Sequence, residues 1–457
     1  MMRNTERALL PPDLNDVDRQ RIADLDSRYV IQPWVQSQSK APRHVVEWGK
    51  GSRFRIDGRE VIDFGSQAGY MSLGYGHPRI VEAMRRQLDV LPVAWSRNAT
   101  EPRARLAERL AQLAPGSGQK VFFSTGGAEA VEAAIMAARE VTGRRKILTH
   151  YLDYHGATSG TIATSGDQRG WQPLNDPTSI VRIPSPYPYR CSICHGACNG
   201  SCFRHIEEII RLEGPGTIAA ILFEPIQGTN GVIVPYDAYL PQLRRLADRH
   251  GILLIADEVM TGLGRTGSWF ACEHWAIVPD ITVVAKGVNS GYVPLGATIL
   301  SASVAEFYDK HPWRRGHSYT GHALAAAAAL ATIESIEDEG LVENARVLGD
   351  ELLRQARELI ASHPSIGEVR GKGLFVGIEL VGNRQTRQPL YDWATGSGSQ
   401  LKRRVLDAVL QNGVSLMEGN ASALILVPPL NISREEIHIA IEAIDMALSI
   451  ADAEVTA

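Results

Sequence analysis

The chain has 457 residues, more than one ordinary hydrophobic core accommodates, so a large domain with a smaller one is expected. Its 47 basic and 51 acidic residues leave a formal net charge of −4, which gives no reason to expect nucleic acid or an anionic membrane as a partner. No apolar run reaches the roughly 20 residues of a membrane span. Residues 1–16 lack the apolar centre of a signal peptide, so a cytoplasmic protein is expected.

Short apolar runs alternate with helical patterns from the N-terminus to about residue 330. A hairpin is expected first, over residues 53–64, with Asp57-Gly58 as its turn. Strands at 120–123, 146–149, 218–223, 252–256 and 281–285 follow, with helices at 128–140 and 239–250. Because these strands are apolar on both faces and helices separate them, they predict an α/β fold whose mostly parallel sheet is covered on both sides.

The pattern changes after about residue 330. Helices are expected at 341–361 and 435–450, with strands at 374–380 and 423–427 between them. This mixture predicts a second, smaller α+β domain. The expected division is an N-terminal segment (1–74) that joins the small domain, a large domain (75–330) and a C-terminal small domain (331–457).

Four distinctive groups stand at predicted strand ends. Gly126-Gly127 follows one strand and opens a helix, and Tyr154-His155-Gly156 follows the next strand. Asp257 and Lys286 each directly follow an apolar strand. Ligands of open parallel sheets bind at the carboxyl ends of the strands, so one cleft is expected to collect these groups.

These residue types suit the chemistry of pyridoxal phosphate. A lysine forms an imine with the aldehyde, and a carboxylate keeps the pyridine nitrogen protonated so that the ring accepts electrons. A glycine-rich helix start binds phosphate, and an aromatic ring stacks on the pyridine. Each residue alone also has an ordinary interpretation: a solvated lysine, a capping aspartate, a tight glycine turn or a half-buried tyrosine.

Longer motifs make the sequence similar to the class III aminotransferases, which use pyridoxal phosphate. The resemblance runs from about Val46 to about Ile450, and its most specific block is Asp-Glu-Val-Met-Thr-Gly-Leu-Gly-Arg-Thr-Gly over 257–267, with Ala-Lys-Gly at 285–287. It also includes Phe-Ser-Thr-Gly-Gly-Ala-Glu-Ala (123–130), Glu-Pro-Ile-Gln-Gly (224–228), Ser-Tyr-Thr-Gly-His (318–322) and Pro-Pro-Leu (428–430). It implies the pyridoxal-phosphate transferase fold of type I, with a sheet of the seven-stranded type.

The resemblance also implies a role for each matching residue. Lys286 would hold the cofactor as a Schiff base, and Asp257 would pair with the pyridine nitrogen. Tyr154 and Val259 would pack on opposite ring faces, with His155 beside Tyr154 in the cofactor site. The remaining matches are Gly126 and Gly127 for the phosphate, Glu224 near the substrate, and Ser318, which would reach the phosphate in a neighbouring subunit. A homodimer with shared active sites is implied, or a tetramer built from it.

The stretch before Pro428 departs from many family members. They bind a substrate carboxylate through an arginine just before Pro-Pro-Leu, where this chain has Ala-Leu-Ile-Leu-Val (423–427). Others use an arginine about ten residues before the first proline, where this chain has Met417, Glu418 and Gly419. A plain amine, a distal amino group or a cationic substrate that pairs with Glu418 is therefore favoured as donor over an α-amino acid. The acceptor would be a 2-oxo acid such as pyruvate or 2-oxoglutarate. Glu418 could equally be a solvated loop residue.

Four of the five cysteines are crowded at Cys191, Cys194, Cys198 and Cys202. In a reducing compartment, this spacing is compatible with a structural zinc site, although it is not that of a zinc ribbon or a ferredoxin. The alternative is a surface insertion with reduced thiols or one disulfide. The sequence assigns no metal.

Three other functions compete with an aminotransferase. A decarboxylase or aminomutase would use the same cofactor. A nicotinamide-dependent oxidoreductase needs a Gly-x-Gly-x-x-Gly turn, which Gly126-Gly127 does not supply. A non-catalytic binding protein would have no use for both Lys286 and Asp257 at strand ends.

Overall fold

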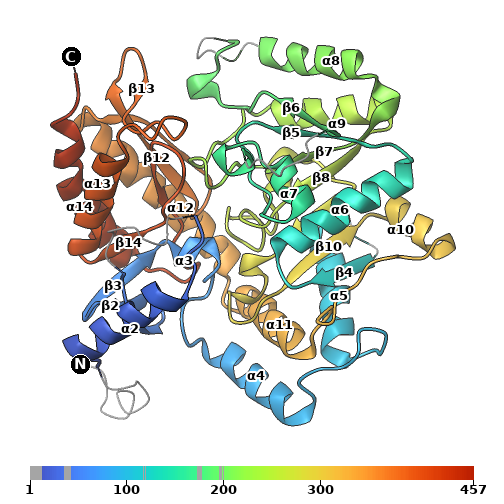
Figure 1. The fold of residues 1–457 in the computed structure, drawn as a ribbon, viewed down its shortest axis with the longest axis horizontal. Helices are drawn as coiled ribbons and strands as arrows, with labels where there is room; N and C mark the ends of the chain where they lie inside the picture. The colour runs from blue at the N-terminus through green and yellow to red at the C-terminus, as the bar shows by residue number, and fades with distance from the viewer. Residues whose placement is uncertain are drawn as a thin grey trace.

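In a computed structural model, the structure describes residues 13–34, 43–116, 118, 120–171, 178–194, 198 and 200–456. A large unit built on one sheet lies beside a smaller unit formed by both ends of the chain (Figure 1). Within these residues, no helix is both long and apolar enough to cross a membrane.

The large unit is built on a seven-stranded sheet with the order β4-β10-β9-β8-β7-β5-β6. Only β10 runs antiparallel, pairing with β4 on one side and β9 on the other. The sheet confirms the predicted mostly parallel α/β fold. Its strands are β4 (Lys120–Ser124), β5 (Lys146–His150), β6 (Ile180–Ile183), β7 (Ile218–Phe223), β8 (Leu253–Asp257), β9 (Ile281–Val284) and β10 (Gly296–Leu300).

Alternate residues of the buried strands face two different hydrophobic cores. Ile221 and Leu254 pack with α8 and α9, whereas Leu222 and Ile255 pack with α6 and α10. This two-residue period explains why the strands are apolar throughout. The helices of the large unit are α4 (Pro78–Val90), α5 (Glu101–Leu113), α6 (Gly127–Thr142), α7 (Ser159–Thr164), α8 (Ser201–Glu213), α9 (Tyr239–His250), α10 (Ala302–Lys310) and α11 (Ala323–Asp338).

The smaller unit contains two sheets. The first sheet has the strand order β1-β2-β3-β14. The expected N-terminal hairpin is β2 and β3; β1 pairs with β2, and β14, from the C-terminal part of the chain, pairs with β3. In the other, β12 pairs with β11, β13 and β15. The strands are β1 (Val46–Lys50), β2 (Arg53–Ile56), β3 (Arg59–Phe64), β11 (Ile366–Gly371), β12 (Val376–Asn383), β13 (Gln388–Pro389), β14 (Val414–Leu416) and β15 (Ala423–Leu426).

Helices at both ends of the chain accompany these sheets. They are α2 (Asp16–Tyr29), α3 (Ser66–Gly69), α12 (Leu341–Glu358), α13 (Ser399–Gln411) and α14 (Arg434–Asp452). The domain boundaries near residues 74 and 330 stay a prediction.

Buried arginines join the two units. Arg265, 2% exposed, donates to the carbonyl oxygens of Leu374 and Pro428. Arg370, 8% exposed, donates to the carbonyl oxygens of Gly231 and Val232 from the neighbouring unit. Guanidinium groups that satisfy several backbone acceptors fix the relative position of the units along one edge of the sheet.

Candidate active site

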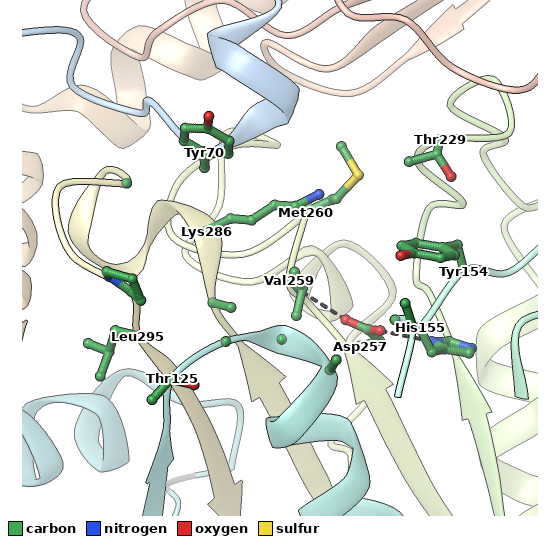
Figure 2. A pocket seen from close by; sticks show the side chains of 18 of the residues that line it. Tyr70, Thr125, Tyr154, His155, Thr229, Asp257, Val259, Met260, Lys286 and Leu295 are labelled. Carbon is green, nitrogen blue, oxygen red and sulfur yellow. Dashed lines mark hydrogen bonds and ion pairs between the residues drawn. The ribbon is translucent and has the colours of Figure 1, made fainter. Parts of the chain in front are cut away.

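A cavity of about 460 Å³ lies at the carboxyl ends of the strands, within the size range of small-ligand sites. Figure 2 shows Lys286 reaching across it, with Tyr70 on one side and Asp257, Val259 and His155 on the other. The cavity brings together nearly all the residues that the sequence singles out. Its lining includes Gly126, Gly127, Tyr154, His155, Glu224, Asp257, Val259 and Lys286.

Lys286 is the second residue after β9 and begins a short 3-10 turn, Lys286–Asn289. Its φ is +41°, in the left-handed region that costs a non-glycine residue about 1–2 kcal/mol. Backbone strain at a residue whose side chain crosses a cavity is typical of a functional position. Desolvation by the surrounding protein lowers the pKa of Lys286 to about 8, so its amine loses a proton readily near neutral pH.

Asp257 ends β8, and protein donors hold both of its oxygens. Oδ1 accepts the backbone N–H of Val259 at 3.1 Å, and Oδ2 lies 2.8 Å from His155 Nδ1 (Figure 2). The carboxylate is 4% exposed and lines the cavity. It is therefore a fixed group that can pair with a cationic ring nitrogen.

A second buried carboxylate, Asp153, lies behind His155. It is 0% exposed and lies 2.8 Å from His150 Nδ1 and 3.5 Å from His155 Nε2. Burial lowers the pKa of His155, but hydrogen bonds and charges from Asp153 and Asp257 outweigh this and raise it to about 10. His155 is therefore an imidazolium between two carboxylates. The sequence interpretation missed Asp153, whose only signal is its place among polar residues after β5.

Glu224 follows β7 and is 6% exposed. Its Oε1 accepts the N–H of Tyr154 and its Oε2 that of Gly228, both at 2.8 Å. Burial, followed by the negative charge of Asp153, raises the pKa of Glu224 to about 8. Burial thus shifts the pKa of Glu224 upward and that of Lys286 downward, each to about 8.

The N-terminus of α6 forms one wall of the cavity. Gly126, Gly127 and Ala128 line it, and a helix start with glycines offers backbone N–H groups to a phosphate. A Cβ on Gly127 would meet both Val259 methyl groups at 3.2 Å, so glycine lets the helix approach the valine closely.

The guanidinium group of Arg169 stacks on the ring of Tyr154, a contact that the sequence interpretation also missed. The guanidinium carbon of Arg169 lies 3.6 Å from the Tyr154 ring centroid, a cation–π contact. Arg169 is oriented by Asp167, whose carboxylate accepts its Nε at 3.0 Å, and it donates to Thr229 in the cavity wall at 2.7 Å. No spacing in the sequence indicated that this arginine reaches the site.

Arg169 also lines a second cavity, of about 920 Å³, which contains Lys402, Arg403 and Glu418. Glu418 does not line the first cavity; its side chain is 64% exposed and lies 3.5 Å from Arg403. Ser318 is exposed in a turn and likewise lies outside the first cavity.

The residues present fit pyridoxal phosphate. The cavity offers a poorly solvated amine, a fixed carboxylate, a tyrosine ring and a helix start, which match the aldehyde, ring nitrogen, ring face and phosphate of that cofactor.

Known proteins agree with this fit. Residues 35–448 match the family model described as aminotransferase class-III. A taurine–pyruvate aminotransferase from Rhodobacter capsulatus is 37% identical, over 90% of this chain and 92% of that protein. A leucine/methionine racemase from Thermococcus litoralis is 34% identical, over 92% and 93% of the two chains. The solved taurine:2-oxoglutarate aminotransferase from Bifidobacterium kashiwanohense, in complex with PLP and glutamate, superposes with a TM-score of 0.92 at 32% identity, covering 98% of this chain and all of that one.

The charge on His155 gives a direct prediction. Asp153→Asn keeps the shape of the side chain but removes one of the two carboxylates, so the pKa of His155 should fall from about 10 by roughly 1 to 3. A titration of ¹³C-labelled histidines by NMR measures this, with the His155 resonance assigned by its loss in His155→Gln. Asp452→Asn, which removes a partner of His363, is the control and should leave His155 unchanged. An unchanged His155 pKa in Asp153→Asn would show that Asp257 alone sets it.

Proposed function

Because the chain belongs to the class III aminotransferase family and is therefore a pyridoxal-phosphate enzyme, we propose that it moves an amino group from an amine or ω-amino acid to a 2-oxo acid. The observation that carries this proposal is the convergence of Lys286, Asp257 and the start of α6 on one cavity. Pyruvate and 2-oxoglutarate are the proposed acceptors. They are the acceptors named for the similar taurine–pyruvate and taurine:2-oxoglutarate aminotransferases, respectively.

Pyridoxal phosphate, when bound, supplies an aldehyde that captures amines and a ring that accepts electrons. We assign Lys286 Nζ to cofactor attachment and to proton transfer at the donor carbon. Its lowered pKa supports both roles, because the neutral amine is the form that attacks an aldehyde and accepts a proton.

Asp257 is assigned to the ring nitrogen. His155 fixes the orientation of its carboxylate, and the protonated imidazole keeps a positive charge beside it. Tyr154 and Val259 are assigned to the two faces of the ring, and Gly126 and Gly127 to the phosphate. Arg169, stacked on Tyr154, would hold that ring in place.

Glu224 is assigned to the substrate side of the cavity. With a pKa of about 8, it holds a proton below that pH and can then donate a hydrogen bond without adding a second negative charge beside Asp257.

The donor proposal rests on what surrounds the site. The three cations of the second cavity already have partners: Arg169 pairs with Asp167, Arg403 pairs with Glu418, and Lys402 donates to the carbonyl oxygens of Gly419 and Ala421. Such a lining does not clamp an α-carboxylate next to the reacting amine. It leaves room for a donor whose amino group is distal to any acid group, such as taurine, β-alanine or 4-aminobutyrate, or for a plain amine.

We also propose a cytoplasmic homodimer with shared active sites. A run of apolar side chains is exposed from the end of α4 onward, including Val90 at 80% and Trp95 at 64%. Exposed apolar runs of this kind mark protein interfaces. Ser318, exposed and outside its own cavity, is assigned to the phosphate site of the partner subunit.

Lys286→Ala should remove the visible absorption band of the bound cofactor and lower kcat/KM at least roughly 10³-fold, because Lys286 is the one lysine that lines the cavity among the residues that the structure describes. Borohydride reduction followed by peptide mass spectrometry should place the cofactor adduct of the unaltered enzyme on Lys286. Lys402→Ala is the matched control: Lys402 is another buried lysine, whose pKa burial lowers to about 8, and its loss should leave the band in place. An adduct on any other lysine would contradict the assignment.

The same preparation separates reaction classes. An aminotransferase consumes donor and 2-oxo acid in equal amounts, whereas a racemase, decarboxylase or aminomutase turns over its amino substrate without a 2-oxo acid. Turnover that is independent of any 2-oxo acid would exclude the proposal.

Glu418 provides a test of the donor. Glu418→Gln should lower KM for taurine or 4-aminobutyrate roughly two- to fivefold, since it removes an exposed negative charge beside the second cavity, and should leave KM for a monoamine unchanged. Steady-state kinetics with both donors measures this, with Glu435→Gln on α14 as the control. A higher KM for a diamine would instead identify a cationic donor that pairs with Glu418.

Val90→Asp should dissociate the proposed dimer, because it places two charges in a symmetric apolar interface. Analytical ultracentrifugation should show a dissociation constant raised at least roughly tenfold. Leu212→Asp is the control, since Leu212 is 69% exposed but lies on α8. An unchanged assembly in Val90→Asp would rule out this face as the interface.

A further inference from the structure

We propose that Cys191, Cys194, Cys198 and Cys202 bind one zinc ion as a structural tetrathiolate site. The four Sγ atoms lie within 4.8 Å of one another, although the cysteines are spread over twelve residues. Four sulfurs about 2.3 Å from a central zinc ion would be about 3.8 Å apart. The cluster therefore has nearly the dimensions of such a site. This proposal is independent of the aminotransferase reaction.

The ligands come from distinct local structures. Cys191 follows a short 3-10 turn, Pro188–Arg190, and Cys202 lies in the first turn of α8. Within the Cys-x2-Cys step, the backbone N–H of Cys194 donates to Cys191 Sγ at 3.3 Å. A hydrogen bond of this kind orients a sulfur ligand and stabilises its negative charge.

The surroundings favour a bound ion over a set of surface thiols. Cys191, Cys194 and Cys202 are 9%, 7% and 3% exposed, and Ile193 and Tyr236 pack against them. The buried members of this cluster are the three cysteines alone, separate from the three larger cores. A core so small contributes little hydrophobic stabilisation, and a metal commonly stabilises such segments.

Sulfur chemistry favours zinc over the other cations. Calcium and magnesium prefer oxygen ligands, whereas a compact set of four thiolates suits zinc. None of the four cysteines lines the cavity that contains Lys286, so the proposed ion would stabilise the local structure and would take no part in the reaction.

The site lies next to the contacts between the two units. Just before Cys191, the hydroxyl of Tyr187 donates to Glu379 Oε2 at 2.6 Å, and Arg190 Nε donates to Oε1 at 2.8 Å. Glu379 on β12 also accepts from Arg370 at 2.8 Å. A metal bound at the cluster would hold the segment that makes these contacts.

The first experiment measures metals by mass spectrometry in the purified holoenzyme after removal of loosely bound ions with a chelator. About one zinc ion per chain is expected. Cys198→Ser should reduce zinc to background, and this cysteine is the least buried of the four, so its change disturbs packing least. Cys272→Ser is the matched control: Cys272 is 0% exposed and lies outside the cluster, so zinc should be retained.

A second experiment uses the unaltered protein and therefore does not depend on whether a cysteine variant folds. Replacement of the ion by Co²⁺ in the unaltered protein should give the red-region absorption bands of tetrahedral cobalt thiolate, which are distinct from the band of the cofactor. Four equivalents of a mercurial thiol reagent should release the zinc. Unaltered protein without zinc, with four reactive thiols or with disulfides detected by mass, would overturn the proposal. Iron in place of zinc, or zinc retained in Cys198→Ser, would do the same.

Discussion

A histidine held between two buried carboxylates governs the charge of the active site. His155 lies between Asp257, which faces the cavity, and Asp153, which is 0% exposed. Of the two carboxylates, Asp257 is the one that lines the cavity, whereas Asp153 is also held by His150 at 2.8 Å. Without the imidazolium, two carboxylates this close together would oppose each other's ionisation. Both carboxylates raise the pKa of Glu224, and the charge of His155 lowers it. At Lys286, Glu224 and Asp257 partly offset the desolvation. The proton affinity of Glu224 therefore depends on this histidine.

Much of this arrangement could be predicted from sequence, because strand ends are local features. The apolar runs before Asp257 and Lys286 predicted that both residues stand at the carboxyl ends of strands. Because neighbouring parallel strands end at the same edge of a sheet, both residues reach one cavity. The expected strands at 252–256 and 281–285 correspond to β8 and β9 within one residue at each end. The hairpin over 53–64 also forms as expected, since Asp57-Gly58 makes a strong turn signal.

Features that depend on contacts distant in sequence could not be predicted. The strands β6 and β10 were not identified, because each is short and its apolar residues are mixed with polar ones that tertiary pairing accommodates. Arg169 reaches Tyr154 only because Asp167 and Thr229 orient it, and Thr229 is 60 residues away. The cysteines were recognised as a group, but a spacing cannot reveal whether their sulfurs converge. In the structure the four sulfurs converge, and three of the four cysteines are buried.

Arginines connect the chemistry of the large unit to the position of the small one. Arg370 donates to the carbonyl groups of Gly231 and Val232, in the same loop as Gly228, whose N–H is held by Glu224. A buried ion pair such as Arg370–Glu379 contributes little net stability after desolvation, but leaving either partner unpaired costs several kcal/mol, on the order of 3–5. Arg370 and Glu379 lie on the neighbouring strands β11 and β12, and Arg370 is the partner that also donates to this loop. Displacing the loop from β11 would therefore leave a buried guanidinium with fewer acceptors. An active-site carboxyl is thus linked to the boundary between the units, because Glu224 holds Gly228 and Arg370 holds the same loop three and four residues later.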